Sequence, residues 1–155
     1  MVINLAFSDF EQTVEKIHFA LKEFYKGNPE PYNRLFSNRE DISLLGAQGG
    51  TSVGPEDVKQ HLTSRASWFK EGQNVRWERV IAFSTHDLGY IVEIERFDVK
   101  MADTNEIANI ALRVTTILRC ENNEWKIIHR IADPLISRID TKTYLSLAKQ
   151  NIKLK

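Results

Sequence analysis

Apolar residues follow a helical spacing in the first half of the chain and an alternating spacing in the second. Spacings of three and four predict helices over about residues 8–26, 32–36 and 55–71. From residue 75 the period changes to two, which predicts strands over residues 75–84, 90–100, 107–119 and 124–132. The segment "DISLLG" is typical of a brief strand between the second and third helices.

Polar residues and glycines mark the ends of these elements. Ser8 and Glu11 have the spacing of a capping box, and Gly27 ends the first helix. The glycines of "GAQGGTSVGP" favour tight turns in a loop that follows the brief strand. Asp140 is placed to cap a C-terminal helical tail over residues 140–150.

The order of these elements indicates the α+β class. Short, turn-rich segments join the four strands, so consecutive strands pair antiparallel. Helices gathered before a sheet are expected to cover one of its faces. A long, curved sheet wrapped against helices encloses a cone-shaped cavity, where ligands bind. The 155 residues predict a single domain, with its core over about residues 8–136.

The last strand, "EWKIIHRIADP", carries polar residues in the same run as its tryptophan and isoleucines. Alternation places five of its residues on one face: Trp125, Ile127, His129, Ile131 and Asp133. Cross-strand pairing would then bring Glu95 and Arg113 next to His129 or Asp133. We therefore expect a polar patch lining the cavity, although a slip of one residue in register would reverse every facing.

Two interpretations of this patch stay open. In one, Arg113 forms a structural ion pair with Glu95 or Asp133, and His129 is a half-buried, hydrogen-bonded histidine. In the other, part of the set contacts a ligand. The same choice between core filling and ligand contact applies to three aromatic residues outside the patch: Trp68, Tyr32 and Phe36.

Composition narrows the class of protein. The hydrophobic fraction of 42% and the charged fraction of 27% are those of a soluble globular chain. Lys plus Arg equals Asp plus Glu, 21 against 21, which favours neither nucleic acid nor an anionic membrane as a partner. No apolar run approaches the roughly 20 residues that span a bilayer, and the N-terminus lacks the basic region of a signal peptide. The single Cys120 fits a reducing compartment, so we expect a cytoplasmic protein.

Motifs for cofactors and metals are missing from the sequence. The glycine-rich loop lacks the G-x-x-x-x-G-K-[ST] pattern of a phosphate-binding loop. The four histidines show no metal-ligand spacing, and no G-x-S-x-G elbow indicates a serine hydrolase. We expect neither a cofactor nor a bound metal.

Three segments resemble the SnoaL-like group of the nuclear-transport-factor-2 and ketosteroid-isomerase superfamily. They are "LFSNREDISLLGAQGGTSVGPEDVKQHL", "DLGYIVEIERF" and "ALRVTTILRCENNEWKIIHRIADPL", and together they extend the resemblance over about residues 10–136. The most specific piece is R-V-T followed by E-N-N-E-W-K-I-I-H-R-x-A-D-P. The resemblance implies a cone of three helices on a curved sheet, and a homodimer formed through that sheet.

The resemblance also implies a pocket near five residues: Glu95, Arg113, Thr115, His129 and Asp133. This chain departs from the group's usual H-R-H-A-D pattern because Ile131 replaces the second histidine, which removes a titratable group. It also departs from the ketosteroid isomerases, whose general-base aspartate would fall near Gly46, where no base exists. Those enzymes combine that base with a tyrosine and a protonated aspartate, a trio that this sequence does not supply.

Three functional hypotheses follow. The leading one is a protein that binds a small apolar or carboxylate-bearing ligand, with no or weak catalysis. The second is an isomerase-, cyclase- or hydratase-type enzyme without a cofactor. In it Asp133 or Glu95 would be the base, His129 an acid and Arg113 an anion stabiliser. The third is a dimerisation or assembly module, because this superfamily serves all three purposes.

The sheet has a second face that three helices cannot cover. That face is expected to carry Tyr90, Val92, Ile94, Val114, Thr116, Leu118 and Ile128 or their alternates, with Arg96 and Arg130 at its rim. Soluble monomers rarely leave so large an apolar patch exposed. We therefore expect a twofold homodimer through the sheet.

Overall fold

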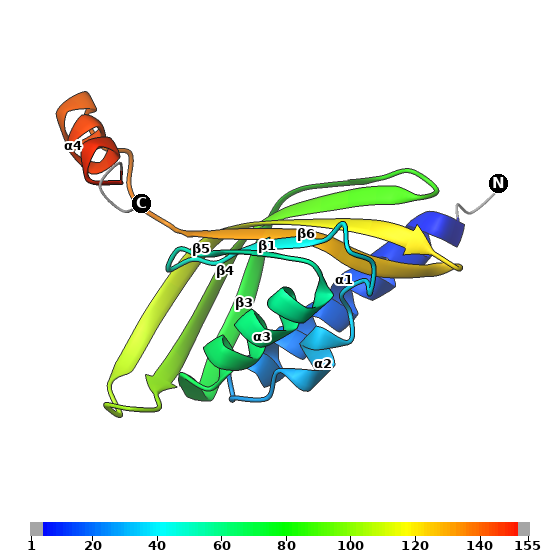
Figure 1. Ribbon diagram of the computed structural model, residues 1–155, viewed down its shortest axis with the longest axis horizontal. Helices are drawn as coiled ribbons and strands as arrows, with labels where there is room; N and C mark the ends of the chain where they lie inside the picture. The colour runs from blue at the N-terminus through cyan, green and yellow to red at the C-terminus, as the bar shows by residue number, and fades with distance from the viewer. Residues whose placement is uncertain (1–4, 152–155) are drawn as a thin grey trace.

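The computed structural model describes the backbone of residues 5–151 and the side chains of residues 9–150. Three helices pack on one face of a strongly curved six-stranded sheet (Figure 1). The helices are α1 (Leu5–Phe24), α2 (Glu30–Asn33), α3 (Pro55–Ala66) and, beyond the sheet, α4 (Thr141–Asn151). The α+β cone expected from the sequence is confirmed.

Four long strands form most of the sheet, in the places where the alternating pattern predicted them. The strands are β1 (Ser43–Leu45), β2 (Thr51–Val53), β3 (Phe69–Ser84), β4 (Leu88–Met101), β5 (Ile107–Glu121) and β6 (Glu124–Pro134). Their order across the sheet is β2-β1-β6-β5-β4-β3. Every neighbouring pair is antiparallel except β1 and β6, which run parallel. The brief strand β1 therefore extends the sheet beside the last strand of the chain.

Element boundaries differ from the sequence predictions where tertiary packing or turn geometry decides them. Helix α1 is already helical at Leu5, ahead of the expected cap at Ser8, whose side chain lies outside the described residues. Helix α3 ends at Ala66 instead of near residue 71. The chain leaves it so that Phe69, the first residue of β3, packs against Phe24 and Tyr25.

The glycine-rich segment is a hairpin and not only a loop. Strand β2 lies within it and pairs with β1, Leu44 opposite Ser52. The turn between the two strands requires the left-handed conformations of Gly49 and Gly50, whose φ angles are 90° and 89°. The expected tight turn is therefore present, together with a strand that the sequence pattern does not predict.

Strand β6 contains a β-bulge at Ile128, and this bulge reverses the facing of every residue after it. Ile127 pairs with Leu118 and His129 with Ile117, so Ile128 is an extra residue on β6. Trp125 and Ile127 point toward the helices before the bulge. After it, the inward residues are Arg130 and Ala132, while His129, Ile131 and Asp133 face outward. The expected single face of five residues is therefore wrong.

The outer face of the sheet carries a different set from the one expected. Tyr90, Val92 and Ile94 do lie there, opposite the buried alternates of β4. On β5 the expectation is wrong, because Val114, Thr116 and Leu118 are buried under the helices. The outward residues of β5 are Arg113, Thr115, Ile117 and Arg119. Arg130, expected at the outer rim, is buried on the inner face.

Helix α4 projects away from the rest of the domain (Figure 1). Its apolar side chains are exposed, Tyr144 to 62% and Leu145 to 50%. Over the part of the chain that the structure describes, no helix is long and apolar enough to cross a membrane.

A glycine fixes the position at which β3 crosses the end of α1. The Gly72 N–H donates to the Tyr25 carbonyl oxygen at 3.1 Å. A Cβ at Gly72 would lie 2.5 Å from that oxygen, a backbone atom that cannot rotate away. This close approach holds Tyr25 against the inner face of the sheet.

We expect Gly72→Ala to lower the free energy of unfolding by about 1–3 kcal/mol, because the added methyl group forces the strand and helix apart. Gln73→Ala, at the exposed neighbouring position, is the control and is expected to change stability by less than about 0.5 kcal/mol. Urea denaturation measures both values. Equal midpoints for the two variants would show that the contact does not constrain the fold.

Candidate active or binding site

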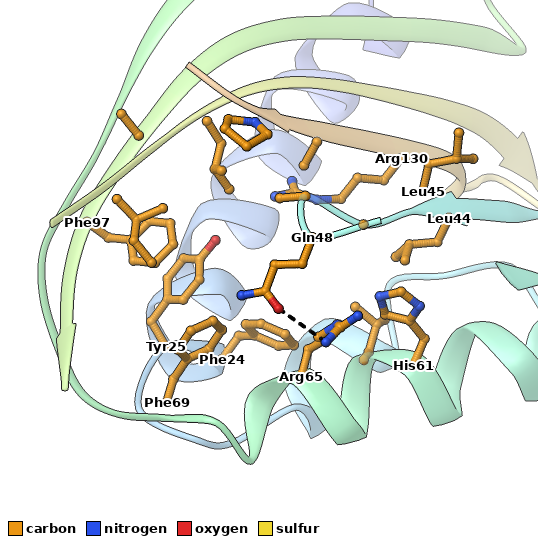
Figure 2. Close-up of a pocket in the computed structure, with 18 of the residues that line it drawn as sticks. Phe24, Tyr25, Leu44, Leu45, Gln48, His61, Arg65, Phe69, Phe97 and Arg130 are labelled. Carbon is orange, nitrogen blue, oxygen red and sulfur yellow. Dashed lines mark hydrogen bonds between the residues drawn. The ribbon is translucent and has the colours of Figure 1, made fainter. Parts of the chain in front are cut away.

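A cavity of about 470 Å³ lies between the end of α1, helix α3, the β1–β2 turn and the inner face of the sheet. Its wall is mainly apolar and is formed by residues including Phe24, Leu44, Leu62, Phe69, Phe97 and Leu112. The volume falls within the range of small-molecule sites in proteins. Figure 2 shows Phe24, Phe69 and Phe97 gathered with Tyr25 on one side of this space, while Gln48 reaches toward Arg65 across the middle of the view.

A buried ion pair forms the polar part of this wall. Arg130 is 7% exposed and Glu95 is fully buried. Arg130 Nη2 donates to Glu95 Oε1 at 2.9 Å. The Tyr25 hydroxyl donates to the same oxygen, and Trp77 Nε1 donates to Oε2 at 2.8 Å. The carboxylate therefore accepts from three donors on three separate elements.

Local sequence explains why these groups meet. Glu95 and Trp77 are paired across β4 and β3, so both point toward the helices. Tyr25 directly follows α1, and its ring stacks on Phe97 at 3.6 Å between centroids. Arg130 reaches Glu95 because the Ile128 bulge turns it inward.

A second buried carboxylate, Glu93, lies two residues before Glu95 on the same face of β4. Glu93 Oε1 and His18 Nε2 are 2.8 Å apart, and the His18 ring stacks on Trp77 at 4.0 Å. Trp77 thus links the two acidic residues: its ring stacks on His18, which contacts Glu93, and its N–H donates to Glu95. This group ties α1 to the sheet outside the cavity.

Burial and charge set the ionisation of the polar wall. Burial raises the pKa of Tyr25 well above its usual value, and the neighbouring Glu95 charge adds to the effect. Burial, the largest single cause, lowers the pKa of Arg130, but the charge of Glu95, the neighbouring tyrosines and the hydrogen bond to Glu95 together outweigh it, and the net shift is upward. Tyr25 is therefore a neutral donor and Arg130 a permanent cation at physiological pH.

Tyr32 lies under the guanidinium of Arg130, with the ring centroid 5.8 Å from Cζ. Burial raises the pKa of Tyr32 to about 12, although the positive charge of Arg130 opposes the shift. Its buried hydroxyl lies close to Arg130 but makes no hydrogen bond of normal geometry to any described group.

The entrance of the cavity is framed by polar side chains of α3 and the β1–β2 turn. Arg65 Nη1 donates to Gln48 Oε1 at 3.3 Å, and Figure 2 shows this bond crossing from the turn to the helix. The Arg65 guanidinium also lies 4.1 Å from the ring centroid of Trp68. His61 Nδ1 is 3.0 Å from Ser52 Oγ, and burial, followed by the charge of Arg65, lowers the pKa of His61.

The structure does not assemble the patch that alternation predicted. Arg113 and Asp133 are paired neighbours on the exposed outer face. Thr115 is half-buried on that face, and Glu95 lies on the opposite one. His129 Nδ1 is 2.8 Å from Ser43 Oγ, and burial lowers the pKa of His129. The roles predicted for these residues therefore have no common cavity in which to act.

The three aromatic candidates also lie outside the cavity wall. Tyr32 and Phe36 are buried in the core, 1% and 5% exposed, and pack edge to face at 5.3 Å. Trp68 is partly exposed beneath Arg65. Tyr32 and Phe36 fill the core, and Trp68 packs against Arg65 at the entrance of the cavity.

Sequence reasoning missed most of the polar wall and the entrance. Arg130 was visible in the last strand but was assigned to the wrong face, because a bulge leaves no mark in an alternating pattern. Tyr25 and Trp77 have no motif of their own, although Tyr25 stands in the aromatic run "EFYKG" at the end of the first helix. Arg65 and Gln48 carried no signal beyond their polarity.

Metal-ligating side chains do not gather in this part of the molecule. Among residues whose side chains are described, no group of three or more His, Cys, Asp or Glu is arranged to hold a metal ion. Cys120 is free and partly buried.

Comparisons with known proteins agree on the fold. A family model described as a SnoaL-like domain matches residues 10–132. A search of curated proteins finds no match in sequence. The chain is similar to a solved nuclear-transport-factor-2-like superfamily protein from Salmonella enterica, with a TM-score of 0.76 at 10% identity, covering 89% of this chain and 96% of the other.

A second similar structure is a ketosteroid isomerase-like protein from Erwinia carotovora, with a TM-score of 0.73 at 12% identity, covering 87% of this chain and 100% of the other. A nuclear-transport-factor-2-like protein from Cytophaga hutchinsonii gives a TM-score of 0.62 at 13% identity, covering 81% and 95%. At these identities the likeness establishes the fold alone.

Replacing Arg130 is expected to cost far more stability than replacing Arg138, an exposed arginine of the segment that follows β6. Arg130→Ala leaves the buried Glu95 carboxylate without its cation, a loss of about 3–5 kcal/mol in the free energy of unfolding. Arg138→Ala removes an exposed side chain and should change stability by less than about 0.5 kcal/mol. Chemical denaturation of both variants checks that Arg130 is buried. Similar losses for the two would place Arg130 outside the core.

Proposed function

Because this chain belongs to the SnoaL-like domain family, we propose that it binds a small, largely apolar molecule in the cone, with no or weak catalysis. The observation that carries the proposal is the cavity itself, a space of about 470 Å³ with an apolar wall and one buried polar group. A pocket of this composition is the usual form of a small-molecule site. The assembly-module alternative gives no reason to maintain such a space.

The groups at the wall support binding more than proton transfer. Four titratable residues line the cavity within the described part of the chain: Tyr25, His61, Arg65 and Arg130. None is a carboxylate, and both oxygens of Glu95 already accept hydrogen bonds. A general base needs a free acceptor within hydrogen-bond reach of the substrate. Of the four, only His61 is of the common base type, and its Nε2 lies against Gly46.

Blocking the cavity should abolish binding. Ala132 lines it, so Ala132→Phe would fill part of the space, at a cost of about 1–3 kcal/mol in stability. In a thermal-shift screen with polycyclic ketones and hydrophobic carboxylates, we expect stabilising compounds for the unmodified protein and none for this variant. Ala102→Phe makes the same change at an exposed turn and should keep the response. Compounds that stabilise all three proteins equally would mean that the cavity is not the site.

We also propose that two copies pair through the outer face of the sheet. The face is rich in apolar side chains, and Ile81 and Phe83 are 50% and 55% exposed. Tyr90, Val92, Ile94, Ile117 and Ile131 extend this surface across four neighbouring strands. A patch of this kind is rarely left in water by a monomer, and identical chains pair most often with twofold symmetry. The lone cysteine of the chain supports a reducing, cytoplasmic setting for this dimer.

Light scattering at micromolar concentration tests the pairing. We expect the mass of two chains for the unmodified protein and of one chain for Val92→Asp. Its cross-strand neighbours, Ile81 and Thr115, carry no charge, so the new carboxylate would be buried unpaired in the interface. Lys59→Asp, on the exposed side of α3, should leave the dimer intact. A monomer in the unmodified protein would exclude this assembly.

A further inference from the structure

We infer that the ligand is an apolar monocarboxylic acid whose carboxylate binds the inner guanidinium of Arg130, while its hydrocarbon body lies along the aromatic wall of the cavity. The inference rests on the proposed binding function and narrows it, since an apolar ligand and a carboxylate-bearing one were both open. It assigns Arg130 the role of anion receptor and Glu95 the role of its positioning partner.

Arg130 has hydrogen-bond donors that the protein itself does not use. A guanidinium has five N–H donors in a planar fork. Among the described residues Arg130 gives a single side-chain hydrogen bond, from Nη2 to Glu95. Its other nitrogens are not sealed in the core, since the buried side-chain atoms without a hydrogen bond, among the described residues, are the Tyr32 hydroxyl and Asn33 Oδ1. Because Arg130 lines the cavity, its remaining donors are available there to an acceptor.

The charges around the cavity favour a negatively charged ligand. The described residues that line the cavity include two arginines and no aspartate or glutamate. Glu95 stands behind Arg130 and divides its hydrogen bonding among Arg130, Tyr25 and Trp77. The neutral donors Tyr25 and Trp77 thus stabilise this carboxylate together with Arg130. The cavity side of the guanidinium is left facing a space that contains no described anion.

The stability of the fold does not require a buried ion pair at this position. A buried ion pair contributes little more to stability than well-packed apolar side chains of the same size. The Arg130–Glu95 pair is therefore not explained by folding alone. A planar carboxylate fits the guanidinium fork through two parallel hydrogen bonds, and such charge-assisted bonds are the strong ones. The pair holds this fork in place before the ligand arrives.

The entrance supports the same sign of ligand charge. Arg65 is held by Gln48 and by the ring of Trp68, so its cation stays at the opening of the cavity. A positive group at the mouth attracts an approaching anion. The single guanidinium at the inner wall and the apolar surface around it fit one carboxylate better than a phosphate dianion, whose burial costs more.

Matched acids and alcohols test the inference by isothermal titration calorimetry. We expect octanoate and naphthoate to bind at least about tenfold more tightly than octanol and naphthylmethanol, the matched alcohols, because the alcohols lack the charged acceptor. If the alcohols bind as tightly as the acids, the inference is wrong and the proposed binding function stands. If neither class binds, the proposed function fails and the inference fails with it.

Variants locate the carboxylate. Arg130→Met alone leaves the Glu95 carboxylate buried without its cation. The informative protein is therefore the double variant Arg130→Met with Glu95→Gln, which removes both charges together. It should bind acids and alcohols equally while keeping the alcohol affinity of the unmodified protein. Arg130→Lys, which keeps the charge but loses the fork, should retain only part of the preference. Arg113→Met on the outer face is the control and should preserve it. A double variant that folds and still prefers acids would overturn the assignment to Arg130.

Discussion

The buried contact between Arg130 and Glu95 is the constraint around which the domain is arranged. Removing two charges from water is costly, and the cost is offset only when the remaining donors and acceptors are satisfied. Glu95 meets this requirement through Tyr25 and Trp77, which come from the end of α1 and from β3. One carboxylate therefore holds the first helix and strands β3, β4 and β6 in a fixed relation. The cavity is the space that this arrangement leaves beside the pair.

The β-bulge at Ile128 makes the contact possible. Without the extra residue, Arg130 would follow the outward parity of Ile128 and face solvent. The bulge lets one strand serve two purposes, a closed apolar end around Trp125 and Ile127 and a polar wall at Arg130. Bulges commonly aim a side chain at a functional site, and here the aimed side chain is an arginine.

Periodicity was enough to predict the α+β class, the four long strands and the cone, because burial on one face leaves a repeating mark in the sequence. It could not predict which residues of β6 face inward, since a bulge changes the parity without changing the composition. Glu95 lies on the inner face of the sheet, whereas His129 and Asp133, which alternation predicts beside it, lie on the outer face. Tyr25 joins the site only through the crossing of α1 and β3, which depends on contacts between residues far apart in the chain.

A double-mutant cycle between Glu95→Gln and Arg130→Met tests the central claim most directly, because it measures the interaction between the two side chains and not the loss of either one. We expect a coupling free energy of about 1–3 kcal/mol in unfolding experiments, as is usual for buried groups in direct contact. A coupling close to zero, with the two single changes adding independently, would contradict it and would leave Arg130 facing away from the core.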